Sequence, residues 1–164
     1  RGCPFECEFC DIIELFGRKP RTKTAQQFLS EVQAVYGTGF RGSLFIVDDN
    51  FVGNKPRVRE LLPDLIDAGL DAINPVQTSC AGMEPAALKR DFGRDLAFWG
   101  GGCDTQTVLP GSSAQHVSAH VRERVGVLAR GGGFVFQQVH NILAFVPPEN
   151  IVAMLDSVNE PRRA

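Results

Sequence analysis

The chain opens with Arg1-Gly2-Cys3-Pro4-Phe5-Glu6-Cys7-Glu8-Phe9-Cys10, and the interpretation of everything after it depends on this run. Its three cysteines have the spacing C-x₃-C-x₂-C. Crowded into a turn with Gly2 and Pro4, three thiolates can occupy three corners of a cubane iron–sulfur cluster and leave the fourth iron without a protein ligand. A closed structural site, whether zinc or iron–sulfur, would need a fourth ligand, which the neighbouring sequence does not supply. The run therefore predicts a cluster with one open iron.

Two simpler interpretations of the cysteines stay open, a zinc knuckle and three thiols with no common role. The chain has five cysteines in all. Three of them crowded into one turn favour a soft metal site, and the odd total argues against a disulfide framework. Both features suit a reducing compartment, so we predict a cytoplasmic protein.

With Phe9 directly before the last cysteine, the run resembles the signature of the radical S-adenosylmethionine (SAM) superfamily, and segments 11–24 and 47–51 resemble its cobalamin-associated branch. The resemblance implies that an electron donor reduces a [4Fe–4S] cluster, which cleaves SAM to methionine and a 5′-deoxyadenosyl radical. Cobalamin would be a further cofactor, and Phe9 would lie at the cofactor site. The implied cluster ligands are Cys3, Cys7 and Cys10. In this superfamily a strand precedes the cysteine loop, so we expect the chain to be a fragment.

The residues after this loop predict one helix and one strand. Phe28, Val32 and Val35 share a helical face over residues 25–36, with Thr24 as the expected cap. The apolar run 43–47 is typical of a strand buried on both faces. Asp48, Asp49 and Asn50 follow it, at the strand end where parallel sheets build their sites. Asp48 and Asn50 can instead merely shape a turn, but the resemblance implies that this strand end approaches the SAM amino group.

The basic run Arg18, Lys19, Arg21 and Lys23 can meet a phosphate or the SAM carboxylate, although such loops are more often simply solvated.

Helices and strands alternate through the rest of the chain. We predict helices over 55–68, 85–92, 114–129 and from Pro147 or Pro148 to 158, with Pro63 awkward inside the first. The strands between them are expected at 70–76, 96–99 and 134–136. Repeated β/α units mean an α/β fold with a parallel sheet, either a partial and incomplete TIM-type barrel or an open layer.

A second resemblance begins at about Leu61. Segments 74–79, 98–106, 139–142 and 147–151 resemble the C-terminal third of the uroporphyrinogen decarboxylase superfamily, which includes corrinoid methyltransferases. The sequence therefore predicts a chimera, with a radical SAM segment over residues 1–60 and a uroporphyrinogen decarboxylase-like segment over 61–164. The join would fall inside a helix acceptable to either family, whether by evolution or by the way the gene was assembled.

His140 is the strongest catalytic candidate of the second segment. It follows a predicted strand, and the resemblance aligns it with a histidine beside the substrate's carboxylates, where it can bind a propionate and move a proton. It can also cap the next turn. Asp104, the second catalytic candidate, lies with Gln106 at the neighbouring strand end and can complete a polar pocket.

Other residues carry weaker signals. Glycines 100–102 stand where a ligand can approach bare backbone. Cys80 and Cys103 are expected to be packing residues, although some corrinoid methyltransferases of the second superfamily use cysteine to bind zinc. His116 and His120 are four residues apart on the predicted helix 114–129, and solvent exposure is the favoured interpretation of both because no H-E-x-x-H motif accompanies them.

Three functional hypotheses follow: a radical SAM enzyme, a decarboxylase or methyltransferase acting on a small molecule such as a tetrapyrrole, and a catalytically silent fragment or fusion product. The third arises because each segment lacks groups that its own chemistry requires. A net charge of −2, shared almost evenly by the two halves, predicts no nucleic-acid or membrane surface. No apolar run reaches the roughly 20 residues that span a bilayer.

Overall fold

The computed structural model describes residues 2–4, 10–21, 23–46, 55–80 and 82–159, with the backbone alone at 55–58. It divides the chain into two compact units, Arg1–Gly69 and Leu70–Ala164. The division falls just after a helix, whereas the predicted join of the two resemblances lies within that helix at residue 61. That join concerns ancestry and stays a prediction.

The first unit is helical in its described part, with α1 (Ile12–Phe16), α2 (Ala25–Gly37) and α3 (Lys55–Asp67). Helix α2 confirms the predicted helix and its cap. Thr24 Oγ1 accepts from the Gln27 amide at 3.2 Å, and Gln27 Oε1 accepts from the Thr24 amide at 2.9 Å. This reciprocal pair satisfies two amides that a helix start leaves without partners. The short α1 was not predicted.

The strand predicted over 43–47 is wrong for its described part. Residues 43–46 form no strand, and Phe45 is 88% exposed instead of buried. A strand buried on both faces needs neighbouring strands to pair with, and the described part of this unit contains none. Val47 lies outside the described residues.

Helix α3 confirms the predicted helix around Pro63, which lies inside it and is exposed. Leu62 and Leu65, from the predicted apolar stripe, are buried. The turn after the helix is closed by the Gly69 amide, which donates to the Ile66 carbonyl at 2.8 Å. Gly69 has a φ of +98°, in the left-handed region that glycine adopts without strain.

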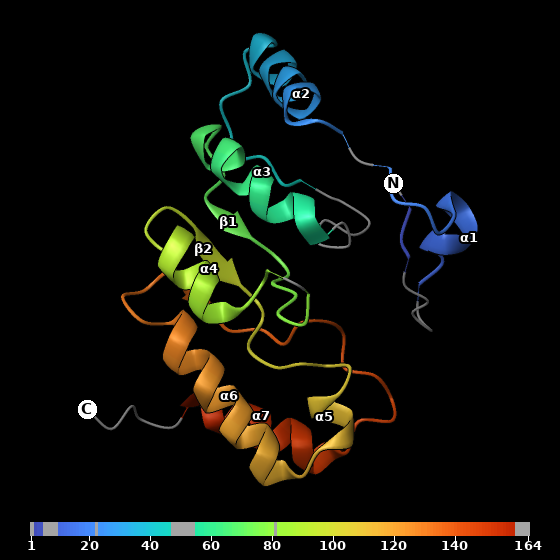
Figure 1. Cartoon of the computed structure of the whole chain (residues 1–164), viewed down its shortest axis with the longest axis vertical. Helices are drawn as coiled ribbons and strands as arrows, with labels where there is room; N and C mark the ends of the chain where they lie inside the picture. Colours follow the sequence, from blue (N-terminus) through green and yellow to red (C-terminus); the bar gives the residue numbers. More distant parts are fainter. Residues whose placement is uncertain (1, 5–9, 22, 47–54, 81, 160–164) are drawn as a thin grey trace. The chain divides into compact units, whose positions relative to one another are not determined.

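The second unit confirms the predicted α/β class with a parallel sheet (Figure 1). Its three strands are hydrogen-bonded in the order β1-β2-β3, with Ile73 opposite Phe98 and Phe98 opposite Phe134. In the described residues the sheet is not closed into a barrel. The strands are shorter than predicted, and α5 was not predicted. The elements are β1 (Ala72–Ile73), α4 (Pro85–Phe92), β2 (Ala97–Trp99), α5 (Val108–Gly111), α6 (Ala114–Leu128), β3 (Phe134–Val135) and α7 (Pro148–Asn159).

The core of the second unit joins the loop after β2 to the helices. Val117 and Val121 of α6 and Met154 of α7 are buried in one cluster with Leu109 of α5 and Cys103. The buried Asn150 ties α7 to α5, because its Nδ2 donates to the carbonyls of Leu109 and Ser112, both at 2.8 Å. These contacts fix the loop that follows β2.

Within the described residues, none of the helices combines the length and the apolar character needed to cross a bilayer.

Candidate functional site

The cysteine loop is held at its start by the segment that follows α1. The Cys3 amide donates to the Gly17 carbonyl at 3.2 Å. Gly2 has a φ of +92°, and a Cβ there would lie 2.5 Å from the Lys19 carbonyl oxygen. Only glycine fits this close approach, so Gly2 is needed for Cys3 to lie where it does.

Two of the three predicted cluster ligands are described. Cys3 is buried, Cys10 is half-buried two residues before α1, and neither forms a disulfide. Soft thiolate donors of this kind suit an iron–sulfur cluster. Cys7 and Phe9 lie outside the described residues, as do Asp48, Asp49 and Asn50. Among the residues that the structure describes, three or more histidine, cysteine or acidic side chains nowhere gather into a metal site, so the ligand set stays a prediction.

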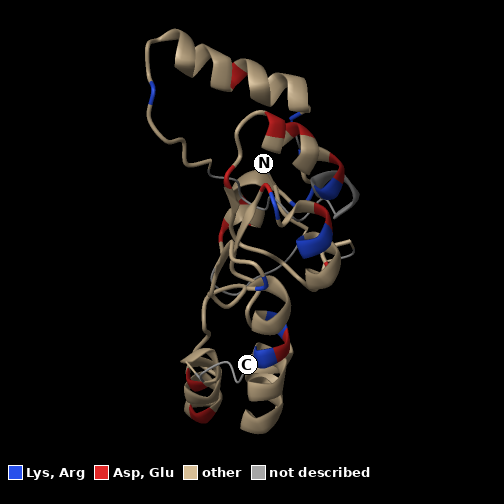
Figure 2. Ribbon diagram, turned by 90° about the vertical axis from the view of Figure 1, so that its left-hand side faces the viewer, with Lys and Arg blue, Asp and Glu red and all other residues tan. Residues whose placement is uncertain are grey.

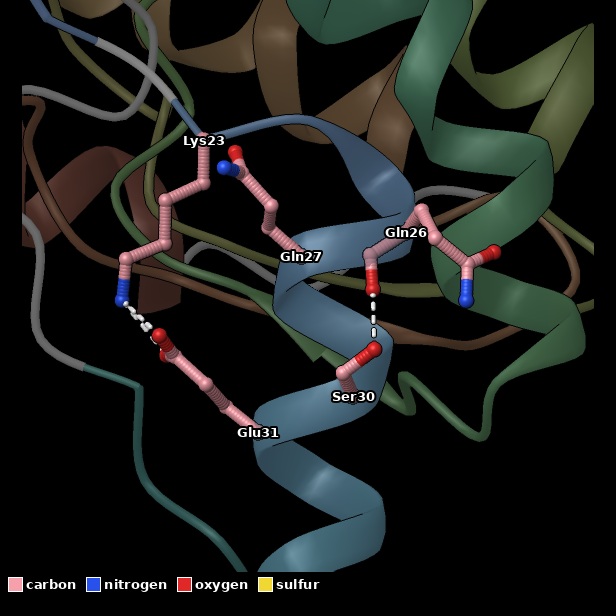
Figure 3. Close-up of a pocket in the computed structure, with 5 residues that line it drawn as sticks. All are labelled: Lys23, Gln26, Gln27, Ser30 and Glu31. Atoms are coloured by element: carbon pink, nitrogen blue, oxygen red, sulfur yellow. Dashed lines mark hydrogen bonds and ion pairs between the residues drawn. The ribbon is translucent and has the colours of Figure 1, made fainter.

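Two cations of the basic run have partners of their own. Lys23 Nζ donates to Glu31 Oε1 at 2.7 Å, and Arg21 donates to the Phe16 carbonyl at 3.2 Å. Figure 3 shows Lys23 and Glu31 reaching toward each other beside α2, at a surface hollow of about 380 Å³. These contacts favour a structural role for this part of the run over an anion site.

The second unit brings Asp104 and His140 to the same edge of the sheet. Beyond the assigned strands, parallel pairing continues from Gly100 N to Val135 O (3.1 Å), Gly102 N to Gln137 O (2.9 Å) and Val139 N to Cys103 O (3.0 Å). Asp104 and His140 each come directly after the last of these bonds. The two predicted catalytic residues therefore lie at neighbouring strand ends.

The glycines at this edge serve packing. Gly100, Gly101 and Gly102 are buried, and a Cβ on Gly102 would overlap the Phe136 ring. A Cβ on Gly101 would lie 3.1 Å from Val76 O, in the loop after β1. The expectation that a ligand approaches bare backbone here is wrong, because the loops after β1 and β3 already occupy that space.

Asp104 shapes the turn that leads into α5. Its Oδ1 accepts from the amides of Gln106 (2.7 Å) and Thr107 (2.9 Å), and its Oδ2 accepts from Thr107 Oγ1 at 3.2 Å. An aspartate at such a turn needs no ligand to explain it. The Asp104 carboxylate nevertheless has a longer-range effect, because its negative charge partly opposes the lowering of the pKa values of His120 and His140 and adds to the raised pKa of Cys103.

The histidines at this edge are held toward their neutral form. Burial lowers the pKa of His140, and the Asp104 carboxylate partly opposes that shift. Burial also lowers the pKa of His120, helped by Arg124 and opposed by Asp104. His120 Nε2 accepts from the Asp104 amide at 3.3 Å. The prediction of exposure is thus confirmed for His116 but wrong for His120, which is half-buried.

Arg124 is a member of this cluster that sequence reasoning missed. Its Nε is buried without a hydrogen-bond partner in the described structure, and so is Thr105 Oγ1 beside Asp104. The signal was the helical stripe: Val117, Val121 and Leu128 are buried on α6, and positions 120 and 124 follow the same face.

Cys103 belongs to the core, as predicted, together with Cys80. Burial raises the pKa of the Cys103 thiol to about 12, with a further push from Asp104 and a smaller opposing effect of Arg124. The thiol is therefore protonated at neutral pH and is a poor metal ligand or nucleophile.

Part of the chain is similar to methyltransferases. An uncharacterized methyltransferase of Synechocystis is 62% identical over 65 residues, 40% of this chain and 12% of that protein. The hopanoid C-2 methylase of Rhodopseudomonas palustris is 50% identical over 66 residues, again 40% and 12%. The cytidylyl-2-hydroxyethylphosphonate methyltransferase of Streptomyces wedmorensis is 28% identical over 88 residues, 54% of this chain and 16% of that protein. The chain thus spans only a small part of these relatives.

No protein-family model and no solved structure matches the chain. None of the relatives named above is a uroporphyrinogen decarboxylase. Homology therefore extends to named methyltransferases over a limited part of the chain, and the second resemblance stays a prediction.

Proposed function

We propose that the first unit is the cluster- and SAM-binding segment of a radical SAM-type methyltransferase. One combined observation carries the proposal. The C-x₃-C-x₂-C run, with Phe9 before its last cysteine, occurs in a chain whose relatives are named methyltransferases at up to 62% identity. Methyl transfer by SAM chemistry accounts for both features.

Each predicted residue has a role in this proposal. Cys3, Cys7 and Cys10 hold a [4Fe–4S] cluster, which when reduced by an electron donor supplies the electron that cleaves SAM. Phe9 contacts the cofactor. Asp48, Asp49 and Asn50 bind the SAM amino group, with cobalamin as a further cofactor of that branch. The Gly17 carbonyl supports the arrangement by fixing the Cys3 backbone.

Anaerobic reconstitution tests the proposal. With iron and sulfide supplied, the chain should gain an absorption band near about 400 nm and about four irons per polypeptide. Cys7→Ser should abolish both. Cys103→Ser is the matched control, because this thiol is buried in the core of the other unit and should leave the iron content unchanged.

Three outcomes would contradict the proposal. The chain could take zinc in preference to iron and sulfide, Cys7→Ser could retain the full iron content, or the reconstituted protein could fail to bind SAM by equilibrium dialysis. Failure of SAM binding alone would leave a cluster-binding module.

A second candidate function belongs to the second unit, where the Arg124 Nε lacks a partner near the His120 imidazole, and where the Asp104 carboxylate acts on both His120 and His140. A partly buried guanidinium near a histidine suits a carboxylate group of a small-molecule substrate, and His140 can move a proton near neutral pH. Tetrapyrrole decarboxylation of the uroporphyrinogen decarboxylase type fits this chemistry.

Porphyrin binding tests the second candidate. Titration of uroporphyrin, followed by its absorption, should be saturable, and Arg124→Gln should weaken it more than Arg130→Gln on the turn after the same helix. Equal weakening by both variants would show a general charge effect and refute the site. The cytoplasmic location predicted from cysteine usage belongs to this proposal as well.

A further inference from the structure

A hollow on the second unit lies outside both candidate sites. It has a volume of about 580 Å³ and lies where α4 and α6 end. The turns after these helices lead directly into β2 and β3, so the hollow is at the amino edge of the sheet, whereas Asp104 and His140 follow the carboxyl ends of the strands. Its charged lining residues are Lys89, Arg90, Arg94 and Arg130.

The charged side chains that line the hollow are all cations. Acidic and basic positions are interspersed along the ribbon as a whole (Figure 2), but no carboxylate lines this hollow. Asp91, next to it in the chain, pairs with Arg90 at 2.8 Å on the helix surface. With Arg90 paired in this way, Lys89, Arg94 and Arg130 give the hollow its excess of positive charge, which the partial negative charges at the ends of α4 and α6 offset only in part.

The Lys89 side chain makes contacts that stabilise the fold. Its Nζ donates to the Gly132 carbonyl at 2.6 Å and lies 5.8 Å from the centre of the Phe98 ring. These contacts hold the turn between α6 and β3 against the sheet. An ammonium has three protons, so Lys89 can still donate to a ligand.

Arg94 and Arg130 differ from Lys89, because neither guanidinium has a hydrogen bond or ion pair to the residues that the structure describes. The negative end of the α4 dipole explains the basic residues in the last turn of that helix, which are Lys89 and Arg90. Arg94 and Arg130 lie beyond the helix ends, and like charges gathered at one hollow repel one another. A bound anion would offset that cost.

We propose that this hollow binds a small molecule that carries a diphosphate or triphosphate group. Guanidinium forks match phosphate oxygens in pairs, and several cations around one hollow suit several linked phosphates. The volume falls in the range of roughly 300–1,000 Å³ that small-molecule sites occupy. A nucleic acid would need an extended basic surface, whereas this chain has a net charge of −2.

Calorimetric titration of the full chain with inorganic pyrophosphate, at about 0.15 M salt, tests the proposal. Binding should be saturable and tighter than that of sulfate. Arg94→Gln and Arg130→Gln should each weaken it about tenfold, the typical effect of losing one charge-assisted contact. Lys89 is left intact because replacing it would also release the Gly132 turn.

Arg122→Gln is the matched control. It removes the same charge from an exposed position of α6 that does not line the hollow, and it should leave pyrophosphate affinity within about twofold. Circular dichroism should show each variant folded. The proposal is overturned if pyrophosphate binding does not saturate, if sulfate binds equally well, or if Arg122→Gln weakens binding as much as Arg130→Gln.

Discussion

Replacing Asn150 by alanine should destabilise the second unit strongly. Asn150 is 2% exposed, and its amide makes two hydrogen bonds of 2.8 Å to the carbonyls of Leu109 and Ser112. Each neutral hydrogen bond contributes about 1 kcal/mol net, and a buried carbonyl left without its donor costs about 1–3 kcal/mol. We expect the free energy of unfolding to fall by about 2–4 kcal/mol, a large share of the roughly 5–15 kcal/mol typical of a folded domain.

Urea unfolding followed by tryptophan fluorescence measures this effect. The chain has a single tryptophan, Trp99, which lies in β2, so the signal reports on the second unit. Asn159→Ala is the matched control. Asn159 is on the same helix and donates to the Leu155 carbonyl at 3.2 Å, but it is exposed. Its loss should change the free energy of unfolding by less than about 0.5 kcal/mol.

A second variant separates the hydrogen bonds from the lost volume. Asn150→Asp keeps the shape but places an acceptor against two carbonyls, so it should destabilise at least as much as alanine at neutral pH. Burial would raise the pKa of this carboxyl, and stability should then recover as the pH falls, because the protonated acid donates one hydrogen bond. The reasoning is refuted if Asn150→Ala costs no more than Asn159→Ala.

Two further predictions concern the same unit, and another compares one cysteine from each unit. Gly102→Ala should destabilise the second unit by about 1–3 kcal/mol in the same assay, because the added Cβ would overlap the Phe136 ring. Gly126→Ala inside α6 meets nothing within 4 Å and should stabilise the unit by about 0.5–1 kcal/mol. The opposite order of the two free energies of unfolding would contradict the packing argument. In the cluster-free chain, iodoacetamide at pH 8 should label the half-buried Cys10 and leave Cys103 unmodified, because burial raises the pKa of the Cys103 thiol to about 12. Mass spectrometry of the digested peptides measures which of the two cysteines carries the label. Burial lowers the folded-state pKa of His120 and His140 below the ordinary 6.5, so the unfolded chain takes up protons first as the pH falls. The free energy of unfolding should therefore fall as the pH drops below about 6.5. His140→Gln should reduce the dependence of this free energy on pH, and an unchanged dependence would count against a lowered pKa of His140.

Local chemistry explains which elements could be predicted. Helix α2 follows from residues close in sequence, since Thr24 and Gln27 cap each other and the apolar spacing is helical. The strand predicted at 43–47 depended on partners elsewhere in the chain, which a short apolar run cannot supply. Phe45 is exposed for that reason.

In the candidate site, too, some residues could be predicted from the sequence and others could not. Asp104 and His140 were predicted because each follows a strand, and parallel strands end at one edge. His120 and Arg124 were missed because an i, i+4 histidine pair was treated as one surface feature. Position 120 in fact turns toward the face that buries Val117 and Val121, while His116 points to solvent.

The second unit determines the geometry of its own candidate site. The loops after its three strands bind one another directly, through Asn74 Nδ2 to Gln137 Oε1 (2.9 Å) and Val139 N to Cys103 O (3.0 Å). The buried glycines 100–102 allow this close approach. Because no residue of the first unit takes part in these bonds, loss of the proposed cluster should leave Asp104 and His140 adjacent. Any proton chemistry at that edge can therefore be tested separately from the iron–sulfur proposal.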